Sequence, residues 1–436
     1  MATGILDECP PGVPVPFFSE VEPVIANEQT AEPVRTRGVG RLEVIVRELE
    51  RQKNERVDVV VDSRTVGVDY LPKPNGDGYV LGLVAKTRQV EEFLGSRPSI
   101  LSTTALGQLG QIVAPKIPTK FFRALAAERP DAAAKLATDL LEATARRILV
   151  RILPDKSGEK RVRAVLSDSY RPIDNYDLAF GALEVAKQWG GDLIKCTLSD
   201  DRFALQFTSR EIWTTLDNEP GGYGNAEFLI ASANYKPEEH APGSRTMPGG
   251  ENSIHPLVTM GNSETGQGGF YVRIGILKAL CFNLTTIEDV LHKIHLGGRN
   301  PLGIYSPETI EKESAAIMSK AKDAIAAAFS PDVFSRMIEL AREASRDEIH
   351  SPSMAIGSLS RVVDISAEAK KSILEYFLRD YSPRDYGGTG DSRRNGSRFG
   401  ISQSIARYAQ DLTDGDQVLR FEDLAGKVLA DGALVR

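Results

Sequence analysis

The fold is decided by one stretch near the middle of the chain, Arg163-Ala-Val-Leu-Ser-Asp-Ser-Tyr-Arg-Pro-Ile-Asp-Asn175, and by the run that precedes it. Ile148–Leu153 and Arg161–Leu166 are runs of strand length, and Pro154–Glu159 between them contains Pro, Asp, Ser and Gly. Two such runs around a turn-rich segment are typical of a β-hairpin. The sequence therefore predicts a basic hairpin at the centre of the fold.

A helix is predicted to follow this hairpin directly, over about residues 175–189. Pro172 with Asp174 or Asn175 favours a helix start, because Pro fits the first helical turn and Asx side chains accept hydrogen bonds from its free amides. Gly190–Gly191 then ends the helix. The signature stretch is thus interpreted as the joint between a strand and a helix.

The remaining elements follow from periodicity and from turn residues. Strands are predicted over 57–61, 79–84, 193–198, 203–207, 228–235, 254–260 and 269–276, and helices over 40–53, 88–95, 103–113, from Pro118, over 130–147, 286–296, 307–329, 331–348, 366–381, 401–412 and 420–431. This order predicts an α+β fold with a central, mostly antiparallel sheet built from hairpins, flanked by N-terminal and C-terminal helices.

Composition divides the chain into four segments. They are an acidic, Pro-rich N-terminal arm over 1–36, an α/β region over 37–145, a central α+β core over 146–285 and a helical region over 286–436. Residues 1–34 contain six Asp or Glu and no Lys or Arg. The arm either lies on the fold or on a neighbouring subunit, or covers a basic groove until a polyanion displaces it.

The bulk properties fit a soluble, cytoplasmic protein. The chain has 436 residues, 41% of them hydrophobic, and a net charge of −7. Its three widely spaced cysteines fit a reducing compartment better than a disulfide framework. No apolar run is long enough for a membrane span, and the N-terminus lacks the pattern of a secretory signal. We therefore expect no membrane partner.

The basic hairpin is the best candidate for a binding surface. Residues 142–175 hold eight Lys or Arg against five Asp or Glu, a local balance of +3. Because side chains alternate along a strand, Arg161 and Arg163 should share one face, opposite Val162 and Ala164. Cations that follow phosphates and aromatics that stack on bases are typical of single-strand binding, and ordinary surface charge is the alternative. The candidate nucleic-acid-binding residues are Arg146, Arg147, Arg151, Lys160, Arg161, Arg163, Tyr170 and Arg171, with Arg393, Arg394 and Arg398 from the Gly-, Ser- and Arg-rich segment 382–399.

No catalytic residue is assigned. Asp168 and Asp174 could approach each other across the proline turn and, with Glu264, could serve a metal-dependent nuclease. Turn and N-cap chemistry explains the same residues without catalysis, and we favour it. The loop Gly261–Gly269 lacks the Lys-Ser/Thr of a phosphate-gripping loop, so it predicts a tight turn, with a backbone-amide surface for phosphate as the alternative.

A metal site is not predicted either. His292 and His295 are spaced i, i+3 on the predicted helix 286–296, with Cys281 and His255 upstream. Three or four such groups could bind zinc, but the paired Cys-x-x-Cys spacing is absent. Capping and surface roles account for these histidines, and no cofactor is expected.

The signature stretch resembles the central motif of a family of phage- and plasmid-encoded prokaryotic proteins of unknown function. The resemblance covers about 100–430, and Phe282 departs from it where the family has a small polar residue. Further similar segments run in the same order: Lys116–Phe122, Gly261–Gly266, Leu277–Asn283, His295–Gly297, Ser404–Ala409 and Phe421–Val428. The resemblance implies a mobile-element setting and DNA metabolism, and the predicted core is similar in outline to single-strand annealing proteins.

These observations lead to three functional hypotheses. The first is a non-enzymatic protein that binds single-stranded DNA and anneals strands as a homo-oligomer. The second is a structural or assembly protein of a phage or mobile element. The third is the nuclease that Asp168, Asp174 and Glu264 would require.

Overall fold

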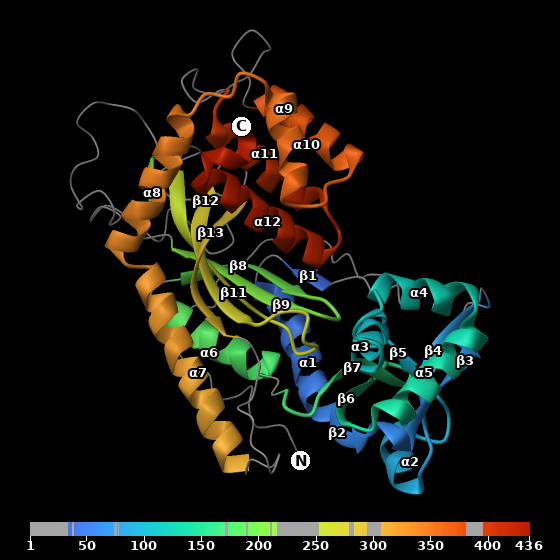
Figure 1. Cartoon of the computed structure of the whole chain (residues 1–436). Coiled ribbons are helices and arrows are strands. Elements are labelled where there is room, and N and C mark those ends of the chain that lie inside the picture. The colour runs from blue at the N-terminus through green and yellow to red at the C-terminus, as the bar shows by residue number, and fades with distance from the viewer. Residues whose placement is uncertain are drawn as a thin grey trace.

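A computed structural model describes residues 34–36, 39–73, 76, 78–170, 173–188, 191–209, 212–215, 253–278, 283–293, 307–380 and 396–436. It has an α+β fold with two mostly antiparallel sheets and a group of C-terminal helices (Figure 1). Residues 1–33 of the N-terminal arm 1–36 and the predicted strand 228–235 lie outside the described residues. The two sheets meet at the segment that the sequence singles out.

The first sheet has the strand order β2-β6-β7-β5-β4-β3, and only the pair β5–β7 is parallel. Helices α2 (Arg88–Leu94), α3 (Thr103–Val113), α4 (Thr119–Glu128) and α5 (Pro130–Thr144) contribute to its apolar core. Thr138 of α5 satisfies both the amide and the carbonyl of Val68, on the edge strand β3. The strands are β2 (Val57–Asp62), β3 (Val66–Pro72), β4 (Tyr79–Ala85), β5 (Ser99–Leu101), β6 (Arg147–Pro154) and β7 (Lys160–Ser167).

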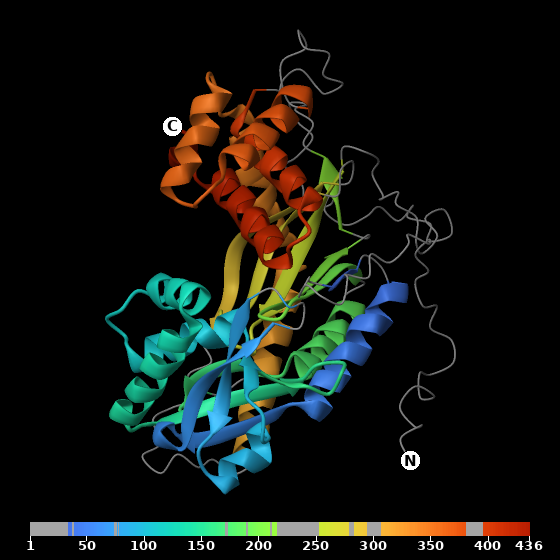
Figure 2. The same ribbon diagram turned by 90° about the vertical axis from the view of Figure 1, so that its right-hand side faces the viewer.

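The second sheet has the order β1-β8-β9-β11-β12-β13, with β10 paired to β11. Helices α1 (Val39–Glu55), α6 (Asn175–Gln188), α7 (Pro307–Ala328) and α8 (Pro331–Arg346) share one apolar core with it. Figure 2 shows α1 and α6 side by side below the strands. The strands are β1 (Val34–Thr36), β8 (Gly191–Leu198), β9 (Phe203–Ser209), β10 (Thr214–Thr215), β11 (Ser253–Asn262), β12 (Phe270–Lys278) and β13 (Asn283–Lys293).

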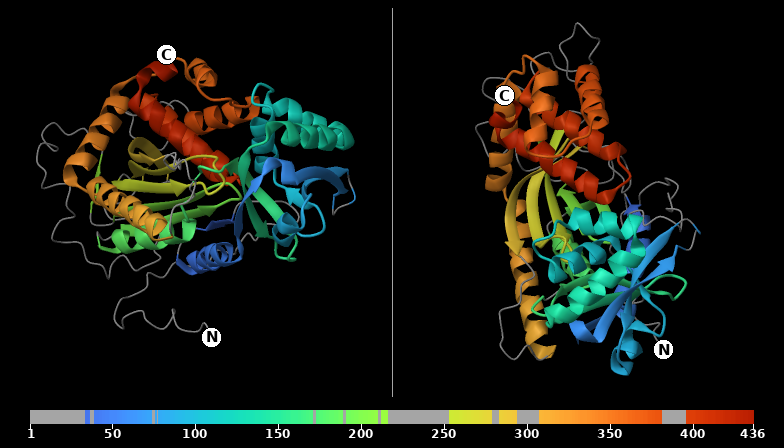
Figure 3. Two further views of the ribbon diagram at one scale, coloured as in Figure 1. Left: turned by 60° about the horizontal axis from the view of Figure 1, so that its bottom comes forward. Right: turned by 45° about the vertical axis from the view of Figure 1, so that its right-hand side comes forward.

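The C-terminal helices lie on the opposite face of the second sheet (Figure 3, left). They are α9 (Pro352–Ser358), α10 (Ala367–Asp380), α11 (Arg398–Asp411) and α12 (Gly415–Ala430), and they enclose an apolar core of their own. Helix α12 approaches β13 closely at Gly426, where a Cβ atom would overlap the carbonyl oxygen of Thr286. Only glycine fits this contact.

The α+β class is confirmed, and so are the basic hairpin and the helix that follows it. The single central sheet is wrong, because the hairpin β6–β7 pairs with β2 and β5 instead of with the later strands. The expected boundary between residues 145 and 146 therefore falls within one sheet.

The predicted helix 286–296 is also wrong, because its described residues, 286–293, lie in β13. Two register irregularities occur where β13 pairs with β12, one between Val272 and Arg273 and one between Ile274 and Gly275. Each extra residue in β13 breaks the two-residue alternation, and the resulting pattern imitates helical spacing. The described helices after the sheets accordingly begin at Pro307.

Candidate nucleic-acid interface and the junction of the sheets

A β-bulge in the hairpin decides where its cations point. Arg151 pairs with Ala164 and Ile152 pairs with Val162, so Arg163 is the extra residue between them. Val162 packs into the core under the helices, whereas Ala164 packs with Leu149 on the other side of the sheet. Val162 and Ala164, which are expected on one face of the strand, therefore lie on opposite sides of the sheet.

Arg151 is fully buried and belongs to an internal charge network. Its guanidinium binds both carboxylate oxygens of Asp58 at 2.8 Å and donates to the carbonyl oxygen of Glu264 at 2.9 Å. The Glu264 carboxylate lies 3.3 Å away. Its neighbour Arg56 pairs with Asp174 and also lies near Asp58. Arg151 stabilises the junction, and in this structure it does not reach the surface.

Arg163 is also engaged inside the molecule. Its guanidinium donates to Gln52 at 3.0 Å and to the carbonyl oxygen of Asp200 at 2.6 Å, and it lies 3.8 Å from Glu264. Burial lowers the pKa of Arg163, and the negative charge of Glu264 opposes that effect. Arg151 and Arg163 therefore share one buried carboxylate.

Glu264 joins this network to the start of helix α6. Its second carboxylate oxygen accepts a hydrogen bond from the amide of Asn175 at 2.7 Å. Asn262 donates to the Ile173 carbonyl oxygen at 2.8 Å and to the Asn175 side chain at 2.6 Å. The β11–β12 turn, which passes through Gly266 at φ 77°, thus holds the strand–helix joint in place. The two motifs that stand out in the sequence are contact partners in the fold.

Tyr170 and Gln108 complete the junction. The Tyr170 hydroxyl donates to the Ser263 carbonyl oxygen at 3.1 Å, and burial raises its pKa. Gln108 of α3 donates to the Thr265 carbonyl oxygen and accepts from the Val165 amide. Tyr170 is only 8% exposed, so its ring is not available for stacking on a base in this structure.

The cations that remain at the surface of the hairpin are separated. Arg161 lies 3.2 Å from Asp155 at one end, and Arg147 lies 4.0 Å from Asp168 at the other. About six residues of strand, or roughly 20 Å, separate these ends. Lys160 donates to the carbonyl oxygen of Phe93. The surface cations of the hairpin that the structure describes therefore do not form one continuous row.

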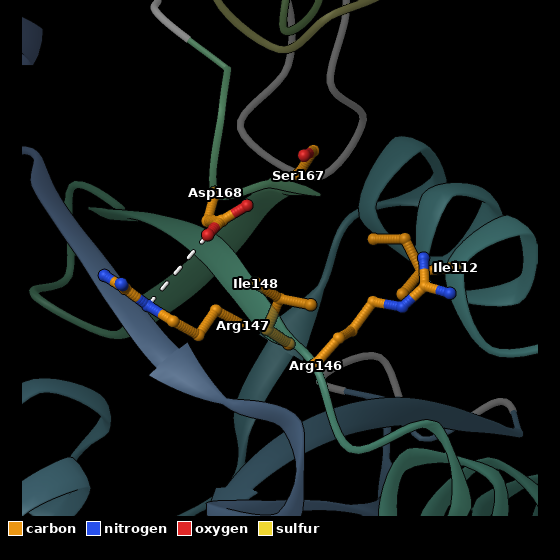
Figure 4. A pocket seen from close by; sticks show the side chains of 6 residues that line it. All are labelled: Ile112, Arg146, Arg147, Ile148, Ser167 and Asp168. Atoms are coloured by element: carbon orange, nitrogen blue, oxygen red, sulfur yellow. Dashed lines mark ion pairs between the residues drawn. The ribbon is translucent and has the colours of Figure 1, made fainter. Parts of the chain in front are cut away.

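Arg146 differs from Arg147, Arg151, Lys160, Arg161 and Arg163, which all have polar partners within the fold. Its side chain is exposed, and no acidic side chain among the described residues pairs with it. Arg146 and Arg147 line an open hollow of about 370 Å³ with Ile112, Ile148, Ser167 and Asp168. In Figure 4, Arg147 turns toward Asp168, whereas Arg146 extends to the other side, toward Ile112 of α3.

Of the three C-terminal candidate residues, Arg398 lies in the described part of the chain. Arg398 is 1% exposed and binds Asp347 at 2.9 Å, Glu343 at 3.3 Å and the carbonyl oxygens of Val428 and Leu429. It is a buried link between α8, α11 and α12, so it is withdrawn from the candidate interface. Arg171, Arg393 and Arg394 lie outside the described residues.

The carboxylates considered for a nuclease are held by arginines. Asp174 binds Arg56, and Glu264 serves Arg151, Arg163 and the start of α6. Within the described ranges no group of three or more His, Cys, Asp or Glu is placed to hold a metal ion. Cys281 and His295 lie outside those ranges, and His292 is part of β13.

A serine–histidine contact also lies inside the second sheet. His255 Nε2 is 3.0 Å from Ser253 Oγ, and its Nδ1 is 2.9 Å from the Ser209 carbonyl oxygen. Both side chains are fully buried, which gives them no access to a substrate in this conformation. We therefore assign Ser253 and His255 a structural role as hydrogen-bond partners inside the sheet.

Sequence reasoning missed the turn between α3 and α4 as a possible contact surface. Lys116 and Lys120 are exposed there, with Ile117 41% and Phe121 54% exposed. The signal was present in Lys116-Ile-Pro-Thr-Lys-Phe-Phe122, where cations and apolar residues alternate around a proline. We name Lys116, Lys120 and Phe121 the α3–α4 surface.

Comparison with known proteins identifies no relative. No family model matches the chain, no curated protein matches it, and no solved structure matches it. The resemblance to phage- and plasmid-encoded proteins therefore stays an expectation. Among the described residues, no helix combines the length and the apolar character needed to cross a bilayer.

Proposed function

We propose that this chain binds single-stranded nucleic acid around Arg146 and that it acts without catalysing a reaction. The observation that supports this most is the exposed Arg146 side chain at the rim of the hollow, without an acidic partner among the described residues. A cation of this kind meets a phosphate without first breaking an ion pair, and it releases counterions from the strand.

The α3–α4 surface extends the proposed site. Ile112 lines the hollow, and Lys116 follows it by four residues, a span of at most about 14 Å. Lys116 and Lys120 add positive charge, and the ring of Phe121 is open to solvent. An exposed ring beside cations suits a flexible single strand, since stacking contributes about 1–3 kcal/mol per base.

The backbone next to Arg146 supports a role for this position. Ala145 has φ 45° and ψ 50°, a left-handed conformation that costs a residue with a side chain about 1–2 kcal/mol. Among the described residues it alone adopts a positive φ without being glycine. Such strain concentrates at functional positions, and here it sets the direction in which Arg146 and Arg147 leave α5.

The family resemblance adds DNA as the nucleic acid and mobile-element DNA metabolism as the setting. Strand annealing by a homo-oligomer is the narrower form of the proposal. Mixing two complementary labelled strands with the protein tests it, and we expect duplex to form faster than without protein.

Fluorescence anisotropy with a labelled 20-nucleotide oligo(dT) tests the binding site itself. We expect the double variant Arg146→Ala/Lys116→Ala to bind at least about tenfold more weakly at low salt, because two phosphate contacts are lost. Arg129→Ala/Lys135→Ala is the matched control, since it also removes one arginine and one lysine, and these exposed residues pair with Asp131 and Asp139. The absence of binding by the unaltered protein, or equal binding by the double variant, would refute the proposal.

A further inference from the structure

A polar row crosses four neighbouring strands of the second sheet on the side that α12 covers. Lys195 of β8 lies opposite Gln206 of β9, which in turn lies opposite Thr259 of β11. Thr259 lies opposite Arg273 of β12. Three strand spacings place the two cations at the ends about 14 Å apart. We call these four residues the Lys195–Arg273 row.

The adjacent row of residues consists of three small residues and one aromatic residue. Thr197, Ala204, Gly261 and Tyr271 are opposite one another in turn on the same four strands. A Cβ atom on Gly261 would overlap the Tyr271 ring, so that ring lies directly over the glycine. The guanidinium carbon of Arg273 is 4.2 Å from the ring centroid. Cations beside an aromatic ring on a sheet surface are the elements that single-stranded nucleic acids require.

Helix α12 places consecutive carboxylates on the Lys195–Arg273 row. One oxygen of Glu422 accepts from Lys195 Nζ and the other from Gln206 Nε2, both at 2.7 Å. The next residue, Asp423, lies 3.4 Å from Arg273. Figure 3 (left) shows the helix across this side of the sheet. Two carboxylates of α12 therefore form ion pairs with the cations at the two ends of the row.

Helix α12 does not satisfy every polar atom on the sheet surface that it covers. Thr197 Oγ1 and Gln206 Oε1 have no hydrogen-bond partner among the described residues, and both residues are at most 2% exposed. Buried polar atoms are nearly always satisfied in an interface made for one partner. The two unpartnered atoms lie on the two rows that face α12, and they indicate capacity for a different ligand.

We propose that the Lys195–Arg273 row is a second binding surface for single-stranded nucleic acid, which α12 covers with Glu422 and Asp423 in the place of phosphates. This inference rests on the proposed function. In the open form the C-terminal helices, which enclose an apolar core of their own, would lie away from the sheet, and Phe399 and Leu429 would leave the core that they share with it. The fraction of molecules in the open form then limits the affinity of this surface.

The test is the double variant Glu422→Gln/Asp423→Asn, measured by anisotropy with the same oligo(dT). It keeps the side-chain shapes and removes both negative charges, so we expect at least about tenfold tighter binding than for the unaltered protein. The matched control is Glu368→Gln/Glu375→Gln on the exposed side of α10, which changes the net charge equally and should not match this gain. Circular dichroism verifies that each variant is folded.

Adding Lys195→Met and Arg273→Met to the double variant should abolish the gain, because the cations of the row are then absent. Hydrogen exchange of the unaltered protein gives a second readout: oligo(dT) should increase deuterium uptake in Gly415–Ala430. An unchanged affinity in the double variant, or a gain no larger than the control's, overturns this inference. If the unaltered protein still binds through Arg146, the proposed function survives that result; if only the double variant binds, the row is supported and the Arg146 surface is not.

Discussion

Replacing Glu264 by Gln should destabilise the junction more than any comparable change at the surface. Glu264 is 4% exposed, and it is the carboxylate that Arg151 and Arg163 share. Glutamine keeps the shape and can still accept from the Asn175 amide, but it presents a neutral group to two buried guanidinium groups. Removing one partner of a buried ion pair costs about 3–5 kcal/mol. Because Arg151 retains Asp58, we expect about 3 kcal/mol.

Urea unfolding monitored by tryptophan fluorescence and by circular dichroism measures this loss. The midpoint of unfolding should shift to a lower urea concentration. The dependence of the unfolding free energy on urea should not change, because the mutation alters the stability and not the surface area that unfolding exposes. Glu142→Gln is the control, because this exposed residue pairs with Lys86 at the surface and its replacement should cost less than about 1 kcal/mol. A cost below about 1 kcal/mol for Glu264→Gln would refute the role of Glu264 as the shared charge of the junction.

Three further changes test other parts of the structure. Ala145→Gly should raise stability by about 1 kcal/mol, because glycine adopts the left-handed conformation of this residue without strain; a loss in thermal unfolding would contradict the assignment. Gly426→Ala should lower stability by about 1–3 kcal/mol, since the added methyl group overlaps the Thr286 carbonyl; an unchanged melting temperature would show that α12 is not seated on β13 as described. Asp200→Asn should stabilise the protein at pH 7, because desolvation of its carboxylate and the neighbouring charge of Asp201 raise the pKa of Asp200, although the residue as a whole is exposed. The native state then binds protons more tightly than the unfolded state, and stability falls as pH rises from the unfolded pKa to the folded one. The gain should disappear toward pH 4 in urea titrations, and a gain independent of pH would contradict the stated cause.

Local sequence signals were sufficient for the elements that short-range chemistry determines. The hairpin β6–β7 follows from apolar runs around a turn. Ser102 and Thr103 both suit the start of α3, and in the structure Ser102 caps it by accepting from the Ala105 amide. The same reasoning failed at β13, because its bulges change the phase of the side chains. Bulges arise from pairing with a neighbouring strand, which one segment alone does not reveal.

In the candidate site, too, local sequence identified the segments but not the contacts between them. The sequence marked Arg163–Asn175 and Gly261–Gly269 separately, but their meeting depends on contacts such as Glu264 with Asn175, which are 89 residues apart. It counted Arg151 and Arg398 as surface cations, whereas Asp58 and Asp347 hold them in the interior. Charge alone does not separate a buried arginine from an exposed one, since both need partners that only the tertiary structure brings close.

The salt dependence of oligo(dT) binding reports whether Arg146 contacts a phosphate. For a single strand, each phosphate contact adds about 0.7 to the slope of log affinity against log salt concentration. We expect Arg146→Ala to reduce this slope by about that amount and Lys135→Ala to leave it unchanged. Binding whose salt slope is identical in the unaltered protein and in Arg146→Ala would contradict the assignment of Arg146 as a phosphate contact.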